Sequence, residues 1–224
     1  MASDYPRMTD LELFDAWMVG DRRAADELFE RHYEAIDRFF RNKVVQGSED
    51  LVQKTLTACV EVHERFRGEA SFRTYLFAIA HNVLRAHYRA RRRESSRLEF
   101  TEISAEDLAP GPSTMVRARR EQQLLLESLR QIPLDYQVVL ELYYWEELSG
   151  SAIAKIIGLR ENTVRSRIRK GKLLLEKKMK ALALTPEEYR STIEDLEAWA
   201  RSIHAGGEPP AGDSDGETPG EDPD

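Results

Sequence analysis

The stretch LSGSAIAKIIGLRENTVRSRIRKGK, from Leu148 to Lys172, decides how the fold of this chain is interpreted. Ser149 can cap a short helix, and Gly158 supplies a tight turn before a second helix that begins near Arg160. Apolar residues at helical spacing anchor both helices from behind: Ile153, Ile157, Val164 and Ile168. This pattern predicts a helix-turn-helix.

The outward face of the second helix carries the kinds of side chain that contact DNA. They are Arg160, Asn162, Thr163, Arg165, Ser166, Arg167, Arg169 and Lys170. Guanidinium, amide and hydroxyl groups can reach base edges and phosphates in a major groove. The alternative is an ordinary helical hairpin with a charged surface. A small residue at Ala154, a glycine at the turn and a basic front face occur together, which favours the DNA-binding interpretation.

Local signals upstream predict four more helices, the first over residues 10–19. Their ends are indicated by a capping box of Thr9 with Glu12, a cap at Asp21, a helix end at Gly47 and a cap at Ser48. The third helix has an apolar stripe of Val52, Thr55, Leu56, Cys59, Val60 and His63, of which we interpret Cys59 and His63 as core residues. The fourth helix, ending near Arg93, has a stripe of Phe72, Tyr75, Leu76, Ile79, Ala80, Val83 and Leu84. These stripes predict one helical bundle.

Composition excludes several classes of protein. The 224 residues include a single cysteine, which excludes a disulfide scaffold and a cysteine-based zinc cluster. No apolar run approaches the roughly 18 residues that a membrane span requires, and the start of the chain lacks a signal-peptide pattern. We therefore expect a cytoplasmic protein that does not bind membranes.

The net charge of −7 is unevenly distributed. Residues 185–224 hold 12 acids and 2 bases, whereas the rest of the chain holds 31 bases and 28 acids. Bases concentrate in two segments, 85–97 and 160–180. Such asymmetry suggests contact with nucleic acid, and the alternative is two solvated helix faces with a solubilising tail.

The chain divides into five parts. We predict an all-α fold of two small helical domains, 1–97 and 115–180, joined by a flexible acidic linker over 98–114. An amphipathic helix over 181–204 and a disordered acidic tail over 205–224 follow.

Both halves resemble the extracytoplasmic-function (ECF, group IV) sigma factors of bacterial RNA polymerase. In the first half the resemblance rests on EDLVQKTLTACVEVHERFRGEASFRTYLFAIAHNVLRAHYRARRR, Glu49 to Arg93. In the second half it rests on IPLDYQVVLELYYWEELS, from Ile132, followed by the helix-turn-helix. The resemblance covers roughly residues 10–180 and implies a two-domain factor for promoter-specific transcription initiation, with region 2 in the first domain and region 4 in the second.

The resemblance also implies three sets of site residues. Those expected at the −35 element are Arg160, Glu161, Asn162, Thr163, Arg165, Ser166, Arg167, Arg169, Lys170 and Lys172. Those expected at the −10 element and its melting are Phe66, Arg67, Gly68, Phe72, Tyr75, Asn82, Arg85, Arg89 and Arg92, with simple core packing as the alternative for Phe72 and Tyr75. Asp50, Gln53 and Lys54 are expected to face polymerase. The acidic linker is expected either to mimic the charge of the transcript or to act as a plain tether.

Two positions depart from the family pattern. Lys54 stands where the family usually has an acid, so phosphorylation of the next residue, Thr55, is a hypothesis for restoring negative charge. Arg160 replaces the usual serine cap, so the recognition helix is expected to begin differently.

The implied partners are core RNA polymerase, through the clamp helices of its largest subunit and the flap of its second largest, and promoter DNA. An anti-sigma factor and a regulatory kinase are further candidate partners. No cofactor, metal or catalytic residue is expected, because no nucleophile, phosphate-loop or metal-ligand pattern occurs. Alternatives are a stand-alone helix-turn-helix regulator and a helical module that sequesters a transcription factor. The final segment is either an accessory helix with a solubilising end or an autoinhibitor that competes with DNA.

Overall fold

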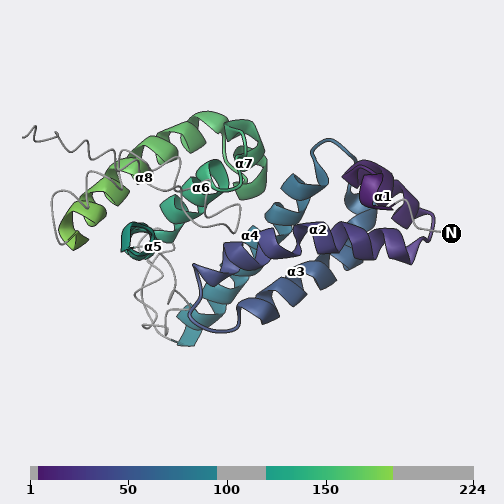
Figure 1. Cartoon of the computed structure of the whole chain (residues 1–224), viewed down its shortest axis with the longest axis horizontal. Coiled ribbons are helices and arrows are strands. Elements are labelled where there is room, and N and C mark those ends of the chain that lie inside the picture. Colours follow the sequence, from purple (N-terminus) through teal and green to yellow (C-terminus); the bar gives the residue numbers. More distant parts are fainter. Residues whose placement is uncertain (1–4, 95–119, 184–224) are drawn as a thin grey trace, which may run out of the picture.

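The computed structural model describes residues 5–94 and 120–183, in which every regular element is a helix (Figure 1). A first group contains η1 (Tyr5–Arg7), α1 (Asp10–Met18), α2 (Arg22–Arg41), α3 (Ser48–Val62), η2 (His63–Arg65) and α4 (Phe72–Glu94). A second group contains α5 (Arg120–Arg130), α6 (Leu134–Tyr144), α7 (Gly150–Ile157) and α8 (Glu161–Leu182). The predicted all-α fold is confirmed.

Side-chain caps begin the first two long helices, as their sequence signals predict. Thr9 and Glu12 form a complete capping box at α1, and the Asp21 carboxylate accepts hydrogen bonds from the first turn of α2. The prediction for Gly47 and Ser48 was wrong. Helix α2 already ends at Arg41, and Gly47 precedes α3 in the left-handed conformation, with φ of 79°, so Ser48 is the first helical residue. Glycine is favoured at such a turn because it has no Cβ.

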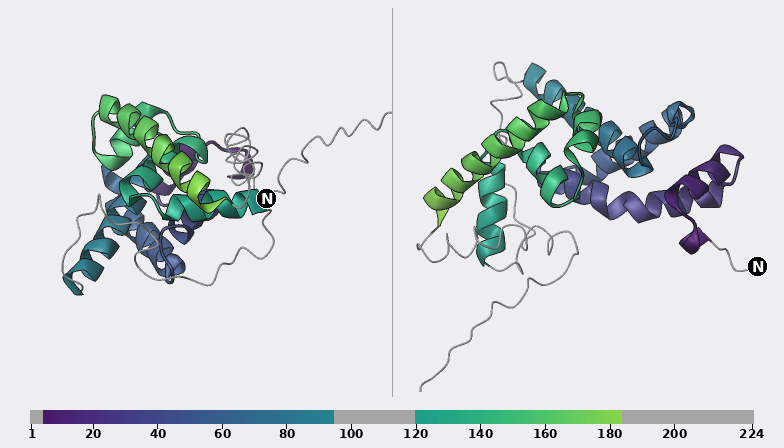
Figure 2. Two further views of the ribbon diagram at one scale, coloured as in Figure 1. Left: turned by 90° about the vertical axis from the view of Figure 1, so that its left-hand side faces the viewer. Right: turned by 90° about the horizontal axis from the view of Figure 1, so that it is seen from above.

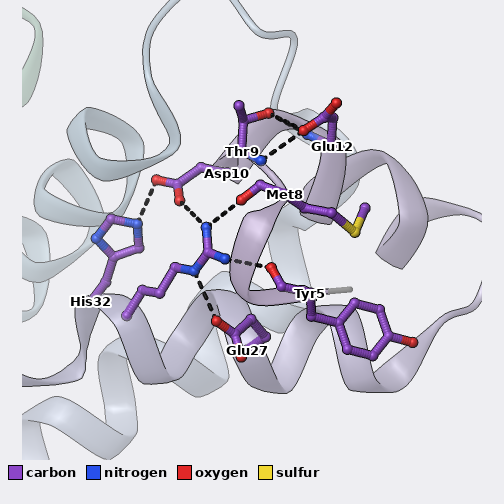
Figure 3. Close-up of polar contacts among 8 residues, drawn as sticks. Tyr5, Met8, Thr9, Asp10, Glu12, Glu27 and His32 are labelled. Atoms are coloured by element: carbon purple, nitrogen blue, oxygen red, sulfur yellow. Dashed lines mark hydrogen bonds and ion pairs between the residues drawn. The ribbon is translucent and has the colours of Figure 1, made fainter. Parts of the chain in front are cut away.

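Polar contacts from α2 hold η1 and the beginning of α1 in place (Figure 3). The Arg31 guanidinium donates to the carbonyl oxygens of Tyr5 and Met8, each at 2.6 Å, and to the Glu27 carboxylate at 3.0 Å. Beside it, His32 Nε2 lies 2.7 Å from the Asp10 carboxylate, and this hydrogen bond lowers the pKa of Asp10 below its ordinary value. These contacts fix η1 and α1 against α2.

Aromatic rings dominate the core of the first group. Phe72, 2% exposed, lies within ring contact of Phe14 and Phe66, at centroid separations of 5.9 and 6.0 Å. Cys59 is fully buried as predicted, and burial raises the pKa of its thiol to about 12. Burial was wrongly predicted for two other residues of this apolar stripe. Val60 is 46% exposed, and His63 is half-buried, with its ring stacked on that of Trp17 at a centroid separation of 4.5 Å. Val60 lies in the last turn of α3, and His63 begins η2 directly after it.

The helix-turn-helix is formed by α7 and α8. The Ser149 hydroxyl accepts from the Ala152 backbone N–H at 3.2 Å, and Gly158 ends α7 in the left-handed conformation, with φ of 69°. Val164 is fully buried behind α8. Arg160 occupies the cap position of α8 without a side-chain hydrogen bond, so the first turn of this helix lacks the cap that a serine would supply.

The two groups pack against each other, as both views of Figure 2 show. One continuous apolar cluster contains buried residues of α1–α4 and of α6–α8. A second, smaller cluster lies within the second group, between α5, α6 and α8. Helix α6 contributes to both clusters and is buried along most of its length, including the polar side chains of Gln137 and Glu141.

Several predicted parts of the chain lie outside the described residues. These are the linker 98–114, the tail 205–224 and the C-terminal helix 181–204 apart from its first three residues, of which Ala181 and Leu182 continue α8. The predicted domain boundaries therefore stay predictions.

Candidate nucleic-acid interface

Helix α8 presents an outward face that is almost entirely polar and cationic. Of the ten residues expected at the −35 element, seven are exposed: Arg160, Asn162, Thr163, Arg165, Ser166, Arg169 and Lys170. Glu161, Arg167 and Lys172 are half-buried. The apolar side of the same helix is held by the protein, so the exposed face is available to a major groove.

Contacts within the second group orient part of this face. The Arg165 guanidinium donates to the Glu161 carboxylate at 2.6 Å, one turn earlier. Arg167 reaches back to the Asp135 carboxylate of α6 at 2.9 Å. Arg167 is therefore engaged by the protein, whereas Arg165 points along the exposed side of α8.

A glycine that the sequence reasoning did not select sets the approach of α8 to α6. A Cβ on Gly171 would lie 3.2 Å from the Leu140 side chain and 3.3 Å from Tyr136 Cβ. That is closer than comfortable packing allows, so glycine permits α8 to lie tightly on α6. Its position within a basic helix, outside any turn pattern, gives little signal in the sequence.

In the first group, the loop before α4 surrounds a recess of about 220 Å³. We call it the loop recess; its lining residues are Phe66, Arg67, Glu69, Ala70, Thr74, Tyr75, Ala78 and Lys155. Gly68 lies in the left-handed conformation, with φ of 70°, and forms the tip of the loop. The recess combines aromatic walls with a cation, which is the chemistry that single unstacked bases favour.

The two aromatic residues of α4 that are expected at the −10 element differ in their exposure. Phe72 is a core residue and does not reach the surface, so its expected contact with DNA is not supported by its position. Tyr75 is half-buried, lines the loop recess and donates its hydroxyl to the Val62 carbonyl at 2.8 Å. The Tyr75 ring is therefore fixed with one side toward the recess.

Polar and basic side chains continue along α4. Asn82, Arg85 and Arg89 are exposed on this helix, and the side chain of Arg92 lies outside the described residues. Underneath, His81 is buried, which lowers its pKa to about 4, assisted by the charge of Arg85. His81 is thus neutral at pH 7 and adds no charge to this surface.

The residues expected to face polymerase lie together on α3. Asp50, Gln53 and Lys54 are all exposed. Lys54 Nζ donates to the Asp50 carboxylate at 2.6 Å, one turn earlier. The lysine therefore neutralises a carboxylate on the same surface.

Thr55 lies on the other side of α3. It is fully buried, and its hydroxyl donates to the Leu51 carbonyl at 2.8 Å. A kinase cannot reach this hydroxyl while α3 is folded, so the structure speaks against the phosphorylation hypothesis. The apolar periodicity that includes Thr55 is the signal that indicates its burial.

Sequence reasoning missed a set of charged contacts between the two groups. Lys43, at the end of α2, forms a buried ion pair with Glu141 of α6. Glu146, after α6, pairs with Arg38 at 3.2 Å and with Arg73. Lys155 of α7 donates to the Glu69 carbonyl at 2.9 Å, at the edge of the loop recess. Helical periodicity assigns charged residues to solvent, so none of these contacts gives a sequence signal.

Within residues 5–94 and 120–183, no cluster of three or more histidine, cysteine or acidic side chains could hold a metal ion. None of the helices in those ranges combines the length and the apolar character needed to cross a membrane.

Comparisons with known proteins match both groups. The family model "Sigma-70 region 2" matches residues 28–94, and "Sigma-70, region 4" matches residues 122–175. The chain is 28% identical over 185 residues to the ECF RNA polymerase sigma-E factor of Escherichia coli K12, covering 79% of this chain and 97% of that protein. It is 25% identical over 185 residues to the protein of the same name from Haemophilus influenzae, covering 79% and 98%.

Two solved structures share the fold. One is CnrH in complex with the cytosolic domain of CnrY, with a TM-score of 0.58, 22% identity and coverage of 78% of this chain and 99% of that one. The other is the sigma factor RpoE in complex with the anti-sigma factor NepR from Bartonella quintana, with a TM-score of 0.56, 22% identity and coverage of 70% and 98%.

Proposed function

This chain belongs to the sigma-70 family of RNA polymerase sigma factors and is of the ECF type, and from that premise we propose that it directs initiation at promoters with specific −35 and −10 elements. The observation that carries the proposal is the order of two matched regions, each with an exposed helix face rich in bases and amides. A stand-alone helix-turn-helix regulator would leave the first group and its loop recess without a role.

For the −35 element, we propose that the exposed part of α8 reads bases in the major groove. Arg165 is the strongest candidate for a bidentate contact with guanine, since its side chain is 70% exposed. Arg169, Lys170 and Lys172 are better suited to phosphates, which supply affinity without sequence information. Arg167 would hold α8 on α6 through Asp135 and contribute less to base recognition.

For the −10 element, we propose that the loop recess receives one unstacked base of the single strand. Phe66 and Tyr75 would stack against the base, and Arg67 would attract the backbone. Arg85 and Arg89 would follow the phosphates along α4, with Asn82 beside the strand. The arrangement supports strand capture by stacking and charge.

We propose core RNA polymerase as the main partner. Asp50, Gln53 and Lys54 of this chain would contact the clamp helices of the largest polymerase subunit, and the second group would contact the flap of the second largest. An anti-sigma factor is a further proposed partner. One solved structure of the same fold is a sigma factor in complex with an anti-sigma factor, and the other is CnrH in complex with the cytosolic domain of CnrY. We propose a cytoplasmic location and a role without catalysis, the chemistry being supplied by polymerase.

The test is run-off transcription with core polymerase over a library of promoters. The expected result is transcription that depends on this protein from a subset of promoters with shared −35 and −10 sequences. No transcript above that of core polymerase alone, together with no binding to core, would refute the proposal.

Two variants on α8 test whether its exposed face recognises the bases of the −35 element. Arg165→Ala is expected to reduce transcription about tenfold or more and to relax the sequence preference at one −35 position, because one bidentate contact is worth about 1–3 kcal/mol. Lys177→Ala removes the same charge from an exposed position of α8 nearer its end and is the matched control. Equal losses in the two variants would indicate a general effect of charge.

A further inference from the structure

Helix α1 lies outside the residues that the region 2 family model matches, which begin at residue 28. It carries two aromatic residues, Phe14 and Trp17, whose rings meet edge to face at a centroid separation of 5.6 Å. Neither residue belongs to the lining of the loop recess. Any part that these rings play in promoter recognition is therefore exercised through the residues that they touch.

The first of these rings supports a wall of the loop recess. Phe66 is half-buried and lines the recess, and its ring meets that of Phe14 edge to face, with the centroids 4.7 Å apart and the planes at 71°. On another side the Phe66 ring touches that of Tyr75 at 5.0 Å. Because aromatic pairs favour defined orientations, Phe14 fixes the plane of the Phe66 ring.

The second ring holds the segment that leads into the loop. His63 is the first residue of η2, and its ring is stacked on that of Trp17, with the centroids 4.5 Å apart and the planes at 15°. The Phe66 backbone N–H donates to the His63 carbonyl at 2.9 Å. A displacement of His63 is therefore passed to Phe66 through the backbone. Trp17 sets where the loop begins, and Phe14 sets how its first ring faces.

Helix α1 is itself held on α2 near both of its ends. At its beginning, Arg31 donates to the Met8 carbonyl and His32 contacts the Asp10 carboxylate (Figure 3). Near its end, Trp17 meets the ring of Phe29 edge to face at 5.3 Å. The stacked pair of Trp17 and His63 therefore connects the loop to a helix that has its own attachments.

We propose that Trp17 and His63 are positioning residues for capture of the −10 strand. Their stacked rings hold η2, and through it Phe66, where the ring can stack on an unpaired base. The inference rests on the proposed function, because the base is the one that the loop recess is proposed to receive. It gives a contact between α1 and η2 a role in promoter melting that ordinary packing does not have.

A thermodynamic cycle with intact and abasic DNA tests this role. Core polymerase carrying the full chain is bound to a forked promoter recovered from the library, double-stranded at the −35 element and single-stranded over the −10 element. One base of that strand at a time is replaced by an abasic site. Stacking predicts that affinity for the parent chain falls about tenfold or more at one position. The ratio of the two affinities at that position is the measured quantity.

Variants of the stacked pair are expected to lower this ratio. Trp17→Ala should weaken binding of the intact fork about tenfold and leave binding of the abasic fork almost unchanged, so the ratio approaches one. Trp17→Phe keeps a ring that can stack on His63 and should restore most of the ratio. His63→Ala should lower the ratio as Trp17→Ala does, and the double variant should lower it no further, because both residues act through one contact.

Phe40→Leu is the control for a general loss of stability. Phe40 is fully buried in the same core near the end of α2, 11 positions after Phe29 and so about 16 Å further along the helix at ~1.5 Å per residue. Denaturant unfolding reports how far each variant is destabilised, and binding is measured at a temperature at which all of them are folded. Phe40→Leu is expected to keep the ratio of the parent chain.

The outcomes separate this inference from the proposed function. An unchanged ratio in Trp17→Ala would overturn the positioning role and leave the proposed function intact. An equal fall of the ratio in Phe40→Leu would also overturn it, since any loss of stability would then suffice. If no abasic position weakened binding of the parent chain, base capture by the loop recess would be refuted, and the positioning role with it.

Discussion

The two helical groups differ in how complete each is alone. The first has an aromatic core formed within its own helices, with Phe72 at its centre, and an arginine that ties down its first residues. The second has a small core of its own, and one side of α6 is completed by the first group. Gln137 and Glu141 lie on that side, and Leu134 and Val138 share it by helical spacing. The second group therefore relies on its neighbour to cover α6, whereas the aromatic rings of the first group pack on one another.

The largest expected effect is a loss of stability in the aromatic core of the first group. Phe72→Ala removes a ring that contacts several other aromatic rings in the core. It is expected to lower the free energy of unfolding by about 3–5 kcal/mol, since the cavity cannot collapse fully. Denaturant unfolding measures this. Phe72→Leu conserves most of the volume and should cost less than about 1.5 kcal/mol; a similar cost for both would contradict central core packing.

The next effect addresses the junction. Lys43→Met leaves Glu141 buried without its partner, which should lower the free energy of unfolding by about 3–5 kcal/mol. Adding Glu141→Leu removes the orphaned charge and should recover most of that loss. Thermal unfolding of the single and double variants gives the coupling. Additive losses would mean that the two residues do not interact.

A pH dependence of stability is expected from the buried His81 of the first group. His81 has a pKa of about 4 when folded and about 6.5 when unfolded, so between these values the unfolded chain binds the extra proton. Stability therefore falls as pH is lowered from about 6.5 to 4, by up to about 3 kcal/mol. His81→Gln should reduce this slope relative to the parent chain in denaturant titrations at several pH values. An unchanged slope would show that folding does not lower the pKa of His81.

The smallest effect concerns the second group alone. Ser149→Ala removes the cap of α7 and should cost about 1 kcal/mol, because one backbone N–H loses its acceptor. Ser149→Asp keeps an acceptor and is expected to retain most of the stability. Hydrogen exchange in α7 reports the change locally. Equal exchange in the alanine variant and the parent would show that the cap contributes nothing.

The features that were predicted correctly from the sequence are those determined by neighbouring residues. The caps at Thr9, Asp21 and Ser149 and the turn at Gly158 depend on residues a few positions apart, and they were predicted correctly. The burial of Cys59 was predicted from the apolar periodicity of its helix alone.

What could not be predicted depends on contacts across the chain. Lys43 and Glu141 are 98 positions apart, and each has the charge that a periodic pattern assigns to solvent. Gly171 is explained only by the approach of Leu140 from another helix. Val60 carries an apolar side chain at a position that periodicity assigns to the core, but it is 46% exposed. Such residues require the tertiary arrangement.

The two-sided burial of α6 has a consequence for how the chain is made. Residues 5–94 leave the ribosome before α6, and the first group can form its core before the second group is complete. When α6 emerges, a surface that fits one of its sides already exists. The order of the two groups along the gene thus lets the first serve as a template on which the DNA-reading group assembles.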